Sequence, residues 1–258
     1  MYDTHTHTRF STDSKMVIED AVNRAREMDV GITITEHMDL AYPDPDAFVF
    51  DIDEYFRAYQ PYRSDDVLLG IEIGMRSELT AENRKIVDGH AFDYVIGSIH
   101  VVDGIDIYQG SFYQGRTKQA VYGRYFQAMV DCLKTYDFID SLGHIDYICR
   151  YARFTDPEIY FDEFKEYLEQ VLGLVADKQI ALEINTRRLG EQKSADLLVP
   201  IYRRFRELGG KYVTLGSDAH TPKDISKHFK LALAMAKECS LKPVRFKARK
   251  VEYLKEGI

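Results

Sequence analysis

The sequence has little cysteine, no tryptophan and no long apolar run. Its three cysteines, Cys132, Cys149 and Cys239, are widely separated, so they predict neither a disulfide framework nor a cysteine-based zinc site and favour a reducing compartment. No stretch reaches the roughly 18 apolar residues that a membrane span needs. Asp3 and His5 stand where a secretory signal needs basic and then apolar residues. We therefore expect a cytoplasmic protein that does not contact a membrane.

Positive charge is also scarce. The chain has 34 lysines and arginines against 42 aspartates and glutamates, which gives a formal net charge of -8. This balance provides no electrostatic footprint for nucleic acid. A P-loop and a GxGxxG pattern are absent as well, so no glycine-rich nucleotide site is predicted. These absences leave a small molecule as the expected partner.

What the chain has is an alternation of short apolar runs and longer amphipathic segments. The strand-like runs cover residues 1–5, 31–35, 67–73, 92–99, 138–145, 180–185 and 212–217. Helix-like segments include residues 17–28, 164–178 and 195–208. Strands that alternate with helices indicate βαβ units and a mostly parallel sheet. Because no polar linker or repeat divides the sequence, we predict one α/β domain over residues 1–258.

Each strand-like run ends in, or just before, a side chain that can bind a metal. These residues are His5, His7, His37, Glu72, His100, His144, Glu183, Asn185, Asp218 and His220. In a parallel barrel the carboxyl ends of all strands open on one face, which carries the chemistry, whereas an open sheet spreads them along a row. We therefore expect a TIM-like barrel with a metal site on that face. The other two histidines, His90 and His228, lie elsewhere and are expected to be structural.

The spacing of two histidines in the first run is that of a chelating pair. Side chains at positions i and i+2 of a strand point the same way, so His5 and His7 can bind one ion from one direction. Asp218 and His220 repeat this geometry in the last run, which a closed barrel places beside the first. Mixed imidazole and carboxylate ligands suit zinc, iron(II) or manganese(II), without selecting among them.

Seven motifs together resemble the PHP (polymerase and histidinol phosphatase) family, in particular its monofunctional histidinol-phosphate phosphatases. The motifs are HTHTRFSTD (5–13), TEH (35–37), GIEIG (70–74), GSIH (97–100), LGHIDYICRY (142–151), EINT (183–186) and GSDAH (216–220). The resemblance implies a distorted seven-stranded (β/α) barrel, in agreement with the seven runs. It also implies hydrolysis of L-histidinol phosphate to L-histidinol and phosphate, a step of histidine biosynthesis.

The resemblance further implies a site for three divalent ions. The first ion would be bound by His5, His7, Glu72 and Asp218. The second would be bound by the same Glu72, as a bridge, with His100 and His144. The third would be bound by Asp13, His37 and His220. All nine positions hold competent ligands, although some relatives have histidine where Asp13 stands, which can alter the metal preference.

The charge of such a site suits a phosphate ester. Three divalent cations exceed the charge of the carboxylates of Asp13, Glu72 and Asp218, so the site is positive in a protein of negative net charge. Two ions bridged by Glu72 would lie roughly 3.5–4 Å apart and lower the pKa of a shared water. We hypothesise that the bridging hydroxide attacks phosphorus in line while the ions stabilise the phosphoryl oxygens, so Glu72, Asp218 and His220 are expected to be catalytic.

Arginines follow the fifth and sixth runs. Guanidinium groups match phosphate bidentately, so Arg150, Arg188 and Arg187 are expected to bind the substrate, and Arg150, the strongest candidate, also to assist catalysis. Arg153 is expected to be a surface charge.

Two carboxylates beside the ligands have open roles. Glu36 and Asp146 can orient a ligand, protonate the leaving group or make an ordinary loop hydrogen bond. Segments 38–66 and 101–117 are expected to be long loops over the mouth of the barrel that recognise the substrate.

Three other interpretations stay open. A PHP phosphoesterase acting on another small phosphate ester or a nucleotide would share the metal chemistry. An amidohydrolase-type barrel also has HxH on its first strand, but generally uses a bridging lysine and a lone terminal aspartate, where this chain has Glu72 and the DAH of 218–220. A degenerate domain that only binds a partner would be expected to have lost ligands, and none is missing here.

Overall fold

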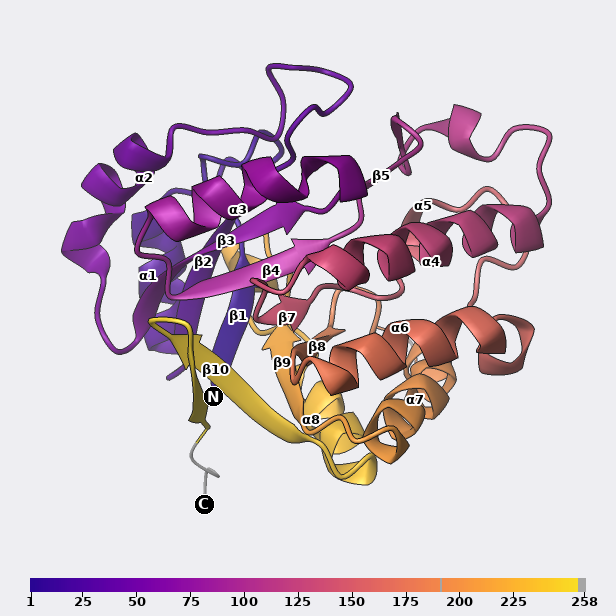
Figure 1. Ribbon diagram of the computed structural model, residues 1–258. Helices are drawn as coiled ribbons and strands as arrows, with labels where there is room; N and C mark the ends of the chain where they lie inside the picture. The colour runs from indigo at the N-terminus through magenta and orange to yellow at the C-terminus, as the bar shows by residue number, and fades with distance from the viewer. Residues whose placement is uncertain (191, 255–258) are drawn as a thin grey trace.

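The computed structural model describes residues 1–190 and 192–254, which form one large sheet wrapped by helices (Figure 1). Nine strands lie in the order β1, β2, β3, β4, β7, β8, β9, β10 and β11. Neighbouring strands are parallel except β10 and β11, which are antiparallel. The strands are β1 (Tyr2–Thr6), β2 (Gly31–Met38), β3 (Val67–Gly74), β4 (Tyr94–Ser98), β7 (Ser141–Leu142), β8 (Ala181–Asn185), β9 (Tyr212–Gly216), β10 (Lys242–Lys247) and β11 (Lys250–Tyr253). A separate hairpin pairs β5 (Val101–Val102) with β6 (Ile105–Asp106).

Helices cover the outside of the sheet, as Figure 1 shows. The α-helices are α1 (Ile18–Glu27), α2 (Ile52–Tyr59), α3 (Thr80–Gly89), α4 (Lys118–Thr135), α5 (Ile148–Tyr151), α6 (Lys165–Asp177), α7 (Gln192–Glu207) and α8 (Phe229–Glu238). The short 3-10 helices are η1 (Gln60–Tyr62), η2 (Ser77–Leu79), η3 (Gly110–Phe112), η4 (Phe161–Glu163) and η5 (Pro222–Asp224). The helical segments predicted over 17–28, 164–178 and 195–208 correspond to α1, α6 and α7.

The pattern of apolar residues explains why these segments adopt their structures. Every residue of β3, VLLGIEIG, is buried, as expected for a parallel strand covered on both faces. Helix α1 buries Ile18, Ala21, Val22 and Ala25, a spacing that places them on one face of a 3.6-residue period. The Asp51 carboxylate caps α2 by accepting a hydrogen bond from the main-chain N–H of Glu54 at 2.9 Å. Buried apolar side chains therefore pack on both faces of the sheet, and most of them lie between the sheet and its helices.

The prediction of a closed barrel is wrong. The seven runs do fall at β1, β2, β3, β4, β7, β8 and β9, but the strand order is open. Within the described residues, β1 and the chain after β9 are joined by one parallel bridge, between Thr6 and Ala219. The first residues of β9 pair instead with β10, with Lys242 opposite Tyr212. Closure fails because a strand that the sequence analysis did not find occupies the edge of β9.

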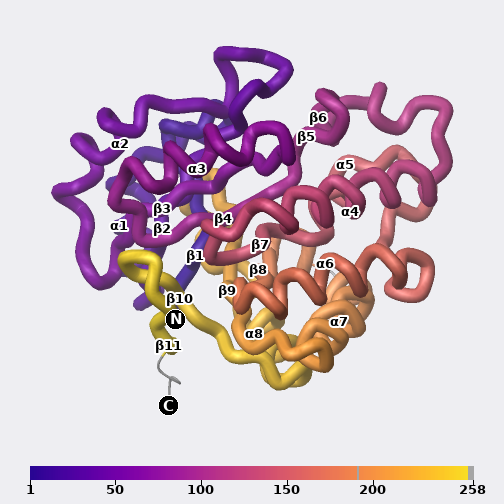
Figure 2. The backbone as a smooth tube through the Cα atoms, in the orientation of Figure 1, coloured from indigo at the N-terminus to yellow at the C-terminus, as the bar shows by residue number. Residues whose placement is uncertain are grey.

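The expected loops over the active face contain regular structure. Segment 38–66 includes α2 and η1, and segment 101–117 includes the β5–β6 hairpin and η3. The prediction that they are loops throughout is therefore wrong, because their amphipathic stretches fold against the core. Figure 2 shows the β5–β6 hairpin at the end of the molecule opposite the N-terminus, and segment 38–66 starts at that end and runs back to the start of β3. That end carries the carboxyl ends of the parallel strands.

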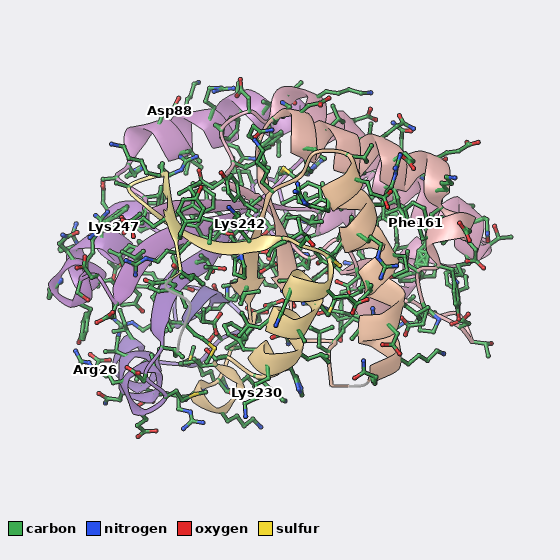
Figure 3. All side chains as sticks on the ribbon, turned by 90° about the horizontal axis from the view of Figure 1, so that it is seen from below. Arg26, Asp88, Phe161, Lys230, Lys242 and Lys247 are labelled. Atoms are coloured by element: carbon green, nitrogen blue, oxygen red, sulfur yellow. The ribbon has the colours of Figure 1, made fainter. Side chains whose placement is uncertain are left out.

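The underside of the sheet is crossed by β10, which runs between the labelled Lys242 and Lys247 in Figure 3. The turn into β11 consists of Ala248 and Arg249, whose φ angles are 48° and 64°. Positive φ at both central residues is typical of a type I′ hairpin turn. The Arg249 guanidinium donates to the Asp140 carboxylate at 2.5 Å, so this hairpin is tied to the start of β7.

Candidate metal centre

The polar side chains expected at the strand ends meet in one cluster. Each lies in a strand or just after one: His5 in β1 with His7 after it, His37 in β2, Glu72 in β3, His100 after β4, His144 after β7, and Asp218 and His220 after β9. The register of β2 and β3 places His37 directly opposite Glu72. The bridge between Thr6 and Ala219 brings the first and last motifs side by side. Residues from nearly the whole length of the chain thus share one site.

Glu72 lies at the centre of the cluster and is fully buried. Its Oε2 is 3.2 Å from His5 Nε2 and 3.5 Å from His7 Nε2. The same oxygen is 2.9 Å from His37 Nδ1. On the other side, Oε1 is 2.8 Å from His144 Nε2 and 3.4 Å from His100 Nε2. One carboxylate is therefore surrounded by imidazoles on both of its oxygens, the position that a bridging ligand requires.

Asp218 and Asp13 lie at the edge of the cluster. Asp218 Oδ1 is 3.5 Å from His7 Nε2. Asp13 Oδ2 is 3.0 Å from His220 Nε2, and its Oδ1 is 3.8 Å from His37 Nε2. The Asp13 side chain is 43% exposed and that of His220 12%, so this end of the cluster faces the solvent.

The structure groups these ligand atoms much as the sequence analysis expects. The following sets have ligand atoms within 4.8 Å of one another: His5, His7 and Glu72; Glu72, His100 and His144; His7, His37 and His220; His5, His144 and Asp218; and His37, Asp39 and His100. The first two match the ligands expected around a bridging Glu72. Asp13 is brought to the third through His37 and His220. His90 and His228 lie outside these sets.

The cluster fits a bound cation because its polar atoms are left without hydrogen bonds. Within the described residues, the following buried atoms make none: His5 Nε2, His7 Nε2, His37 Nδ1, Glu72 Oε2, His144 Nδ1 and His220 Nε2. A buried polar atom without a partner raises the free energy of the fold. Nitrogen and oxygen lone pairs that converge in this way are the donor set of a divalent metal such as zinc.

Second partners hold several of the imidazole rings in place. His5 Nδ1 is 2.6 Å from Glu183 Oε1, and His100 Nδ1 is 2.8 Å from Asp39 Oδ1. His220 Nδ1 lies 2.9 Å from the carbonyl oxygen of Asp218. An acceptor at Nδ1 places the ring proton there and leaves the Nε2 lone pair free for a metal.

Electrostatics keep the central carboxylates ionised. Burial raises the pKa of Glu72, but His5, His37 and His100 outweigh it and hold that pKa well below its ordinary value. Burial acts in the same way on Asp218, where Arg150 and His5 lower its pKa well below the ordinary value. Ionised carboxylates are the form that binds metals.

The three arginines expected to bind phosphate have different surroundings. The Arg150 side chain is 7% exposed and donates to Asp218 Oδ2 at 2.5 Å and to Asn185 Oδ1 at 2.7 Å. The Arg187 side chain is 43% exposed and donates to Asp218 Oδ1 at 3.3 Å.

Arg188 already has two carboxylate partners. It donates to Asp146 Oδ2 at 2.9 Å and to both oxygens of Glu158 at 2.8 Å. The exposed Arg153 contacts the carbonyl of Tyr108 at 3.5 Å. Of the three arginines, Arg187 therefore has the guanidinium that is most free to turn towards a ligand.

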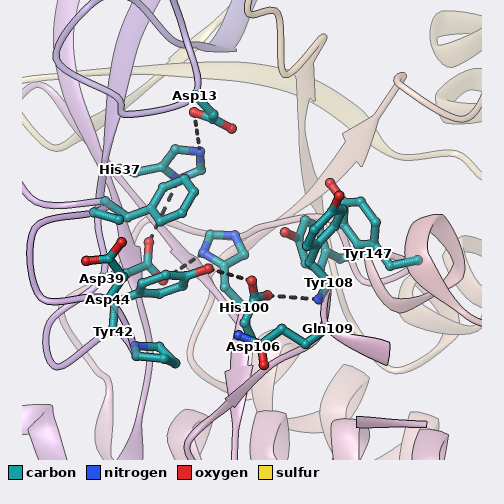
Figure 4. Close-up of a pocket in the computed structure, with 14 residues that line it drawn as sticks. Asp13, His37, Asp39, Tyr42, Asp44, His100, Asp106, Tyr108, Gln109 and Tyr147 are labelled. Atoms are coloured by element: carbon teal, nitrogen blue, oxygen red, sulfur yellow. Dashed lines mark hydrogen bonds and ion pairs between the residues drawn. The ribbon is translucent and has the colours of Figure 1, made fainter. Parts of the chain in front are cut away.

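A cavity of about 630 Å³ opens beside the cluster (Figure 4). Its lining consists of Asp13, His37, Asp39, Tyr42, Pro43, Asp44, Ala47, Phe48, His100, Asp106, Tyr108, Gln109, Tyr147 and Tyr151. His37, His100 and Asp13 belong both to this lining and to the cluster. Four aspartates and several aromatic rings thus line a pocket that adjoins the candidate metal ligands.

Some residues of the site were missed by the sequence analysis. Asp39 holds His100 and lines the pocket, and Glu183 holds His5 while accepting a hydrogen bond from the main-chain N–H of His144 at 2.7 Å. A signal was available for Asp39, which stands two residues after His37 and hence on the same side of an extended chain. Glu183 was noted at a strand end but was not given a role.

Comparison with known proteins identifies the family of this chain. The sequence model of the PHP domain matches residues 3–187. A protein of Clostridium acetobutylicum named probable histidinol-phosphatase is 50% identical over 98% of this chain and 99% of its own length. The histidinol-phosphatase of Lactococcus lactis is 33% identical over 86% of this chain and 84% of its own length.

A solved structure has nearly the same fold. It is the histidinol phosphate phosphatase of Lactococcus lactis complexed with zinc, L-histidinol and phosphate, with a TM-score of 0.92, 31% identity and coverage of 97% of this chain and 98% of that one. The chain therefore belongs to the PHP domain family. Over residues 1–190 and 192–254, none of the helices has the length and apolar character needed to cross a membrane.

Proposed function

We propose that this chain is a metal-dependent phosphomonoesterase that hydrolyses L-histidinol phosphate to L-histidinol and phosphate in histidine biosynthesis. One observation carries the proposal: the candidate metal ligands His37 and His100 also line the acidic, aromatic cavity. The resemblance to named histidinol-phosphatases, over nearly the whole chain, supports this substrate. A structural relative that holds zinc, L-histidinol and phosphate supports the same chemistry.

The charge of the substrate matches the two halves of the site. L-histidinol phosphate has a phosphate dianion at one end and an ammonium and an imidazole at the other. The phosphate fits the end where Arg187 and the candidate metal ligands lie. The ammonium fits the aspartates of the cavity, among them the exposed Asp44, and the imidazole fits between rings such as Phe48 and Tyr147.

The ligands can hold three divalent ions, zinc, iron(II) or manganese(II), in the sets expected from sequence. The first set is His5, His7, Glu72 and Asp218. The second is Glu72, His100 and His144. The third is Asp13, His37 and His220. When bound, such ions supply Lewis acidity towards phosphoryl oxygens and lower the pKa of water. The unpartnered lone pairs of the cluster support this assignment.

The residues of the chain then prepare the phosphate for transfer. Arg187 lies on the solvent side of Asp218 and can turn its guanidinium to the phosphoryl oxygens, where its fixed positive charge stabilises developing negative charge. Arg150 holds Asp218 from the buried side, so it positions a ligand and also contributes charge. Arg188 stays a prediction, and binding phosphate would require it to leave Asp146 or Glu158.

Neither carboxylate considered as a leaving-group acid faces the cavity. Glu36 is fully buried and accepts hydrogen bonds from Thr8 and Ser11. Asp146 is buried and paired with Arg188. Their contacts support a role in holding neighbouring residues in place.

The test compares substrates on the metal-reconstituted protein. We expect phosphate release from L-histidinol phosphate to exceed release from a generic aryl phosphate and from nucleoside monophosphates, and to be lost with a chelator. Asp44→Asn should raise KM for L-histidinol phosphate about 1.5-fold to 5-fold, the effect of one exposed ion pair, and leave KM for the aryl phosphate unchanged. Asp46→Asn, in the same loop but outside the cavity lining, is the matched control.

Two outcomes would count against the proposal. Turnover of the aryl phosphate without turnover of L-histidinol phosphate would keep the phosphatase chemistry and reject the substrate, in favour of another small phosphate ester or a nucleotide. No turnover with any divalent metal would reject the enzyme assignment itself.

A further inference from the structure

The hydroxyl of Ser11 lies between two metal-ligand residues and a buried carboxylate. Ser11 Oγ is 2.5 Å from Glu36 Oε2, 3.2 Å from His7 Nδ1 and 3.1 Å from the main-chain nitrogen of His37. Ser11 is 1% exposed, and Glu36 and His7 are fully buried. The hydrogen bonds of this oxygen must therefore be satisfied by these three groups.

Counting donors determines the direction of each bond. A serine hydroxyl has one proton and two acceptor sites. The main-chain N–H of His37 can only donate. Both Glu36 oxygens face donor groups of Thr8, and Ser11 Oγ donates its proton to Glu36 Oε2. One acceptor site then remains on Ser11 Oγ, and it faces His7 Nδ1. His7 must accordingly have its proton on Nδ1.

Glu36 has the surroundings of a group that only accepts. The main-chain N–H of Thr8 lies 3.0 Å from each of its oxygens, and Thr8 Oγ1 donates to Oε1. Tyr59 OH is 2.6 Å from Thr8 Oγ1 and extends this chain of hydrogen bonds to α2. Every protein group that contacts the Glu36 carboxylate can therefore donate a hydrogen bond to it.

We propose that Glu36 and Ser11 together fix the tautomer of His7 so that its Nε2 lone pair is free for a metal. The carboxylates of Glu183 and Asp39, which contact His5 and His100, accept hydrogen bonds and so fix the tautomers of those rings directly. A serine hydroxyl alone can either donate to His7 or accept from it. Because the Ser11 proton is given to Glu36, Ser11 can only accept from His7. This inference deepens the proposed metal centre and makes Ser11 and Glu36 positioning residues.

Removal of Ser11 should reverse the tautomer. His7 Nε2 lies 3.5 Å from Glu72 Oε2 and 3.5 Å from Asp218 Oδ1. Without an acceptor at Nδ1, these carboxylates favour a proton on Nε2, which must then leave before a metal binds. The affinity for the ion bound by His7 should consequently fall, by about 10- to 100-fold for the loss of such a supporting partner.

The experiment reads the tautomer directly in metal-free protein labelled with 15N-histidine. Long-range 1H–15N NMR spectra distinguish protonated from unprotonated ring nitrogens, and the His7→Gln variant identifies the His7 signals. We expect a proton on Nδ1 in the wild type and on Nε2 in Ser11→Ala, with weaker Zn²⁺ binding in competition with a chromophoric chelator. Ser14→Ala is the control, because the Ser14 hydroxyl bonds the main-chain carbonyls of His7 and His220 and not a ring.

Either of two results would overturn the inference. One is a His7 proton on Nε2 in the wild type, a result that does not depend on how the Ser11→Ala variant folds. The other is a Ser11→Ala protein with an unchanged His7 tautomer. Failure to hydrolyse L-histidinol phosphate would reject the proposed substrate but would leave the tautomer result intact, so the two failures are distinguishable.

Discussion

At the scale of single residues, the site is an arrangement of charge that folding alone does not favour. Glu72 and Asp218 are buried, and several imidazole and carboxylate atoms around them make no hydrogen bond. Burying such groups without partners costs several kcal/mol each as an order of magnitude. A divalent cation would give those lone pairs a partner and so offset the unfavourable burial. The charge of the same proposed cation would attract a phosphate.

Arg187→Ala tests the phosphate end of the site at this scale. Loss of one charge-assisted hydrogen bond, about 1.5–3 kcal/mol, should lower kcat/KM for L-histidinol phosphate roughly 10- to 100-fold. Steady-state kinetics on the metal-reconstituted variant measure it. Arg153→Ala, an exposed arginine bonded to the Tyr108 carbonyl, is the control and should retain wild-type kinetics. Equal activity in both variants would remove Arg187 from the site.

At the scale of elements, the strands that carry ligands were readable from sequence because they are buried on both faces. Runs such as GITIT and VLLGIEI are rich in β-branched and other apolar residues, and both fall in long strands that are buried throughout. The run at 138–145 is paired only at Ser141–Leu142. There Gly143 lies so close to β4 that a Cβ would overlap Ser98 Oγ, and the chain leaves regular pairing.

Elements stabilised by distant contacts could not be read in this way. Strand β10, KPVRFK, alternates polar and apolar residues and is only partly buried, so its sequence resembles a surface segment. Its buried Val244 and Phe246 pack against Tyr94 of β4. The turn that follows is held by contacts with residues more than a hundred positions away: Arg249 donates to Asp140, and the main-chain N–H of Ala248 donates to Asp93 at 3.0 Å. The same β10 keeps the sheet open, which is why the barrel prediction failed.

The same distinction between local sequence and distant contacts applies to the candidate site. The candidate ligand positions could be predicted because histidines at strand ends have few structural reasons to be there, and the structure brings these side chains together. Segments 38–66 and 101–117 line much of the cavity, as the substrate-recognition prediction for them implies, but the individual residues could not be predicted, since Asp106 and Asp44 reach the cavity only through the folding of these segments. The pairing of Arg188 with Glu158 likewise depends on tertiary structure.

The β10–β11 turn provides a prediction for the element scale. Ala248 is exposed with φ of 48°, a left-handed conformation that costs alanine about 1 kcal/mol. Asparagine tolerates this conformation, so Ala248→Asn should raise the free energy of unfolding by about 0.5–1 kcal/mol in urea denaturation. Ala91→Asn, at an exposed alanine outside the left-handed region, should give no such gain. A loss of stability in Ala248→Asn would contradict the turn assignment.

At the scale of the whole molecule, the parallel strands position the side chains on which the proposed function depends. They deliver side chains from residue 5 to residue 220 to one end, while the β10–β11 hairpin lies across the other (Figure 1). The net charge of -8 is compatible with a phosphate ester because the proposed cations reverse the charge locally. The aspartates that remain in the cavity then suit the positive end of the substrate.

The most direct measurement is metal content and phosphate release in Glu72→Gln. This variant keeps the shape of the side chain and removes the central charge. We predict loss of bound divalent metal and a fall of at least about 100-fold in turnover of L-histidinol phosphate. Glu78→Gln, an exposed glutamate paired with Arg76, should retain both. A folded Glu72→Gln protein with wild-type metal content and activity would contradict the account.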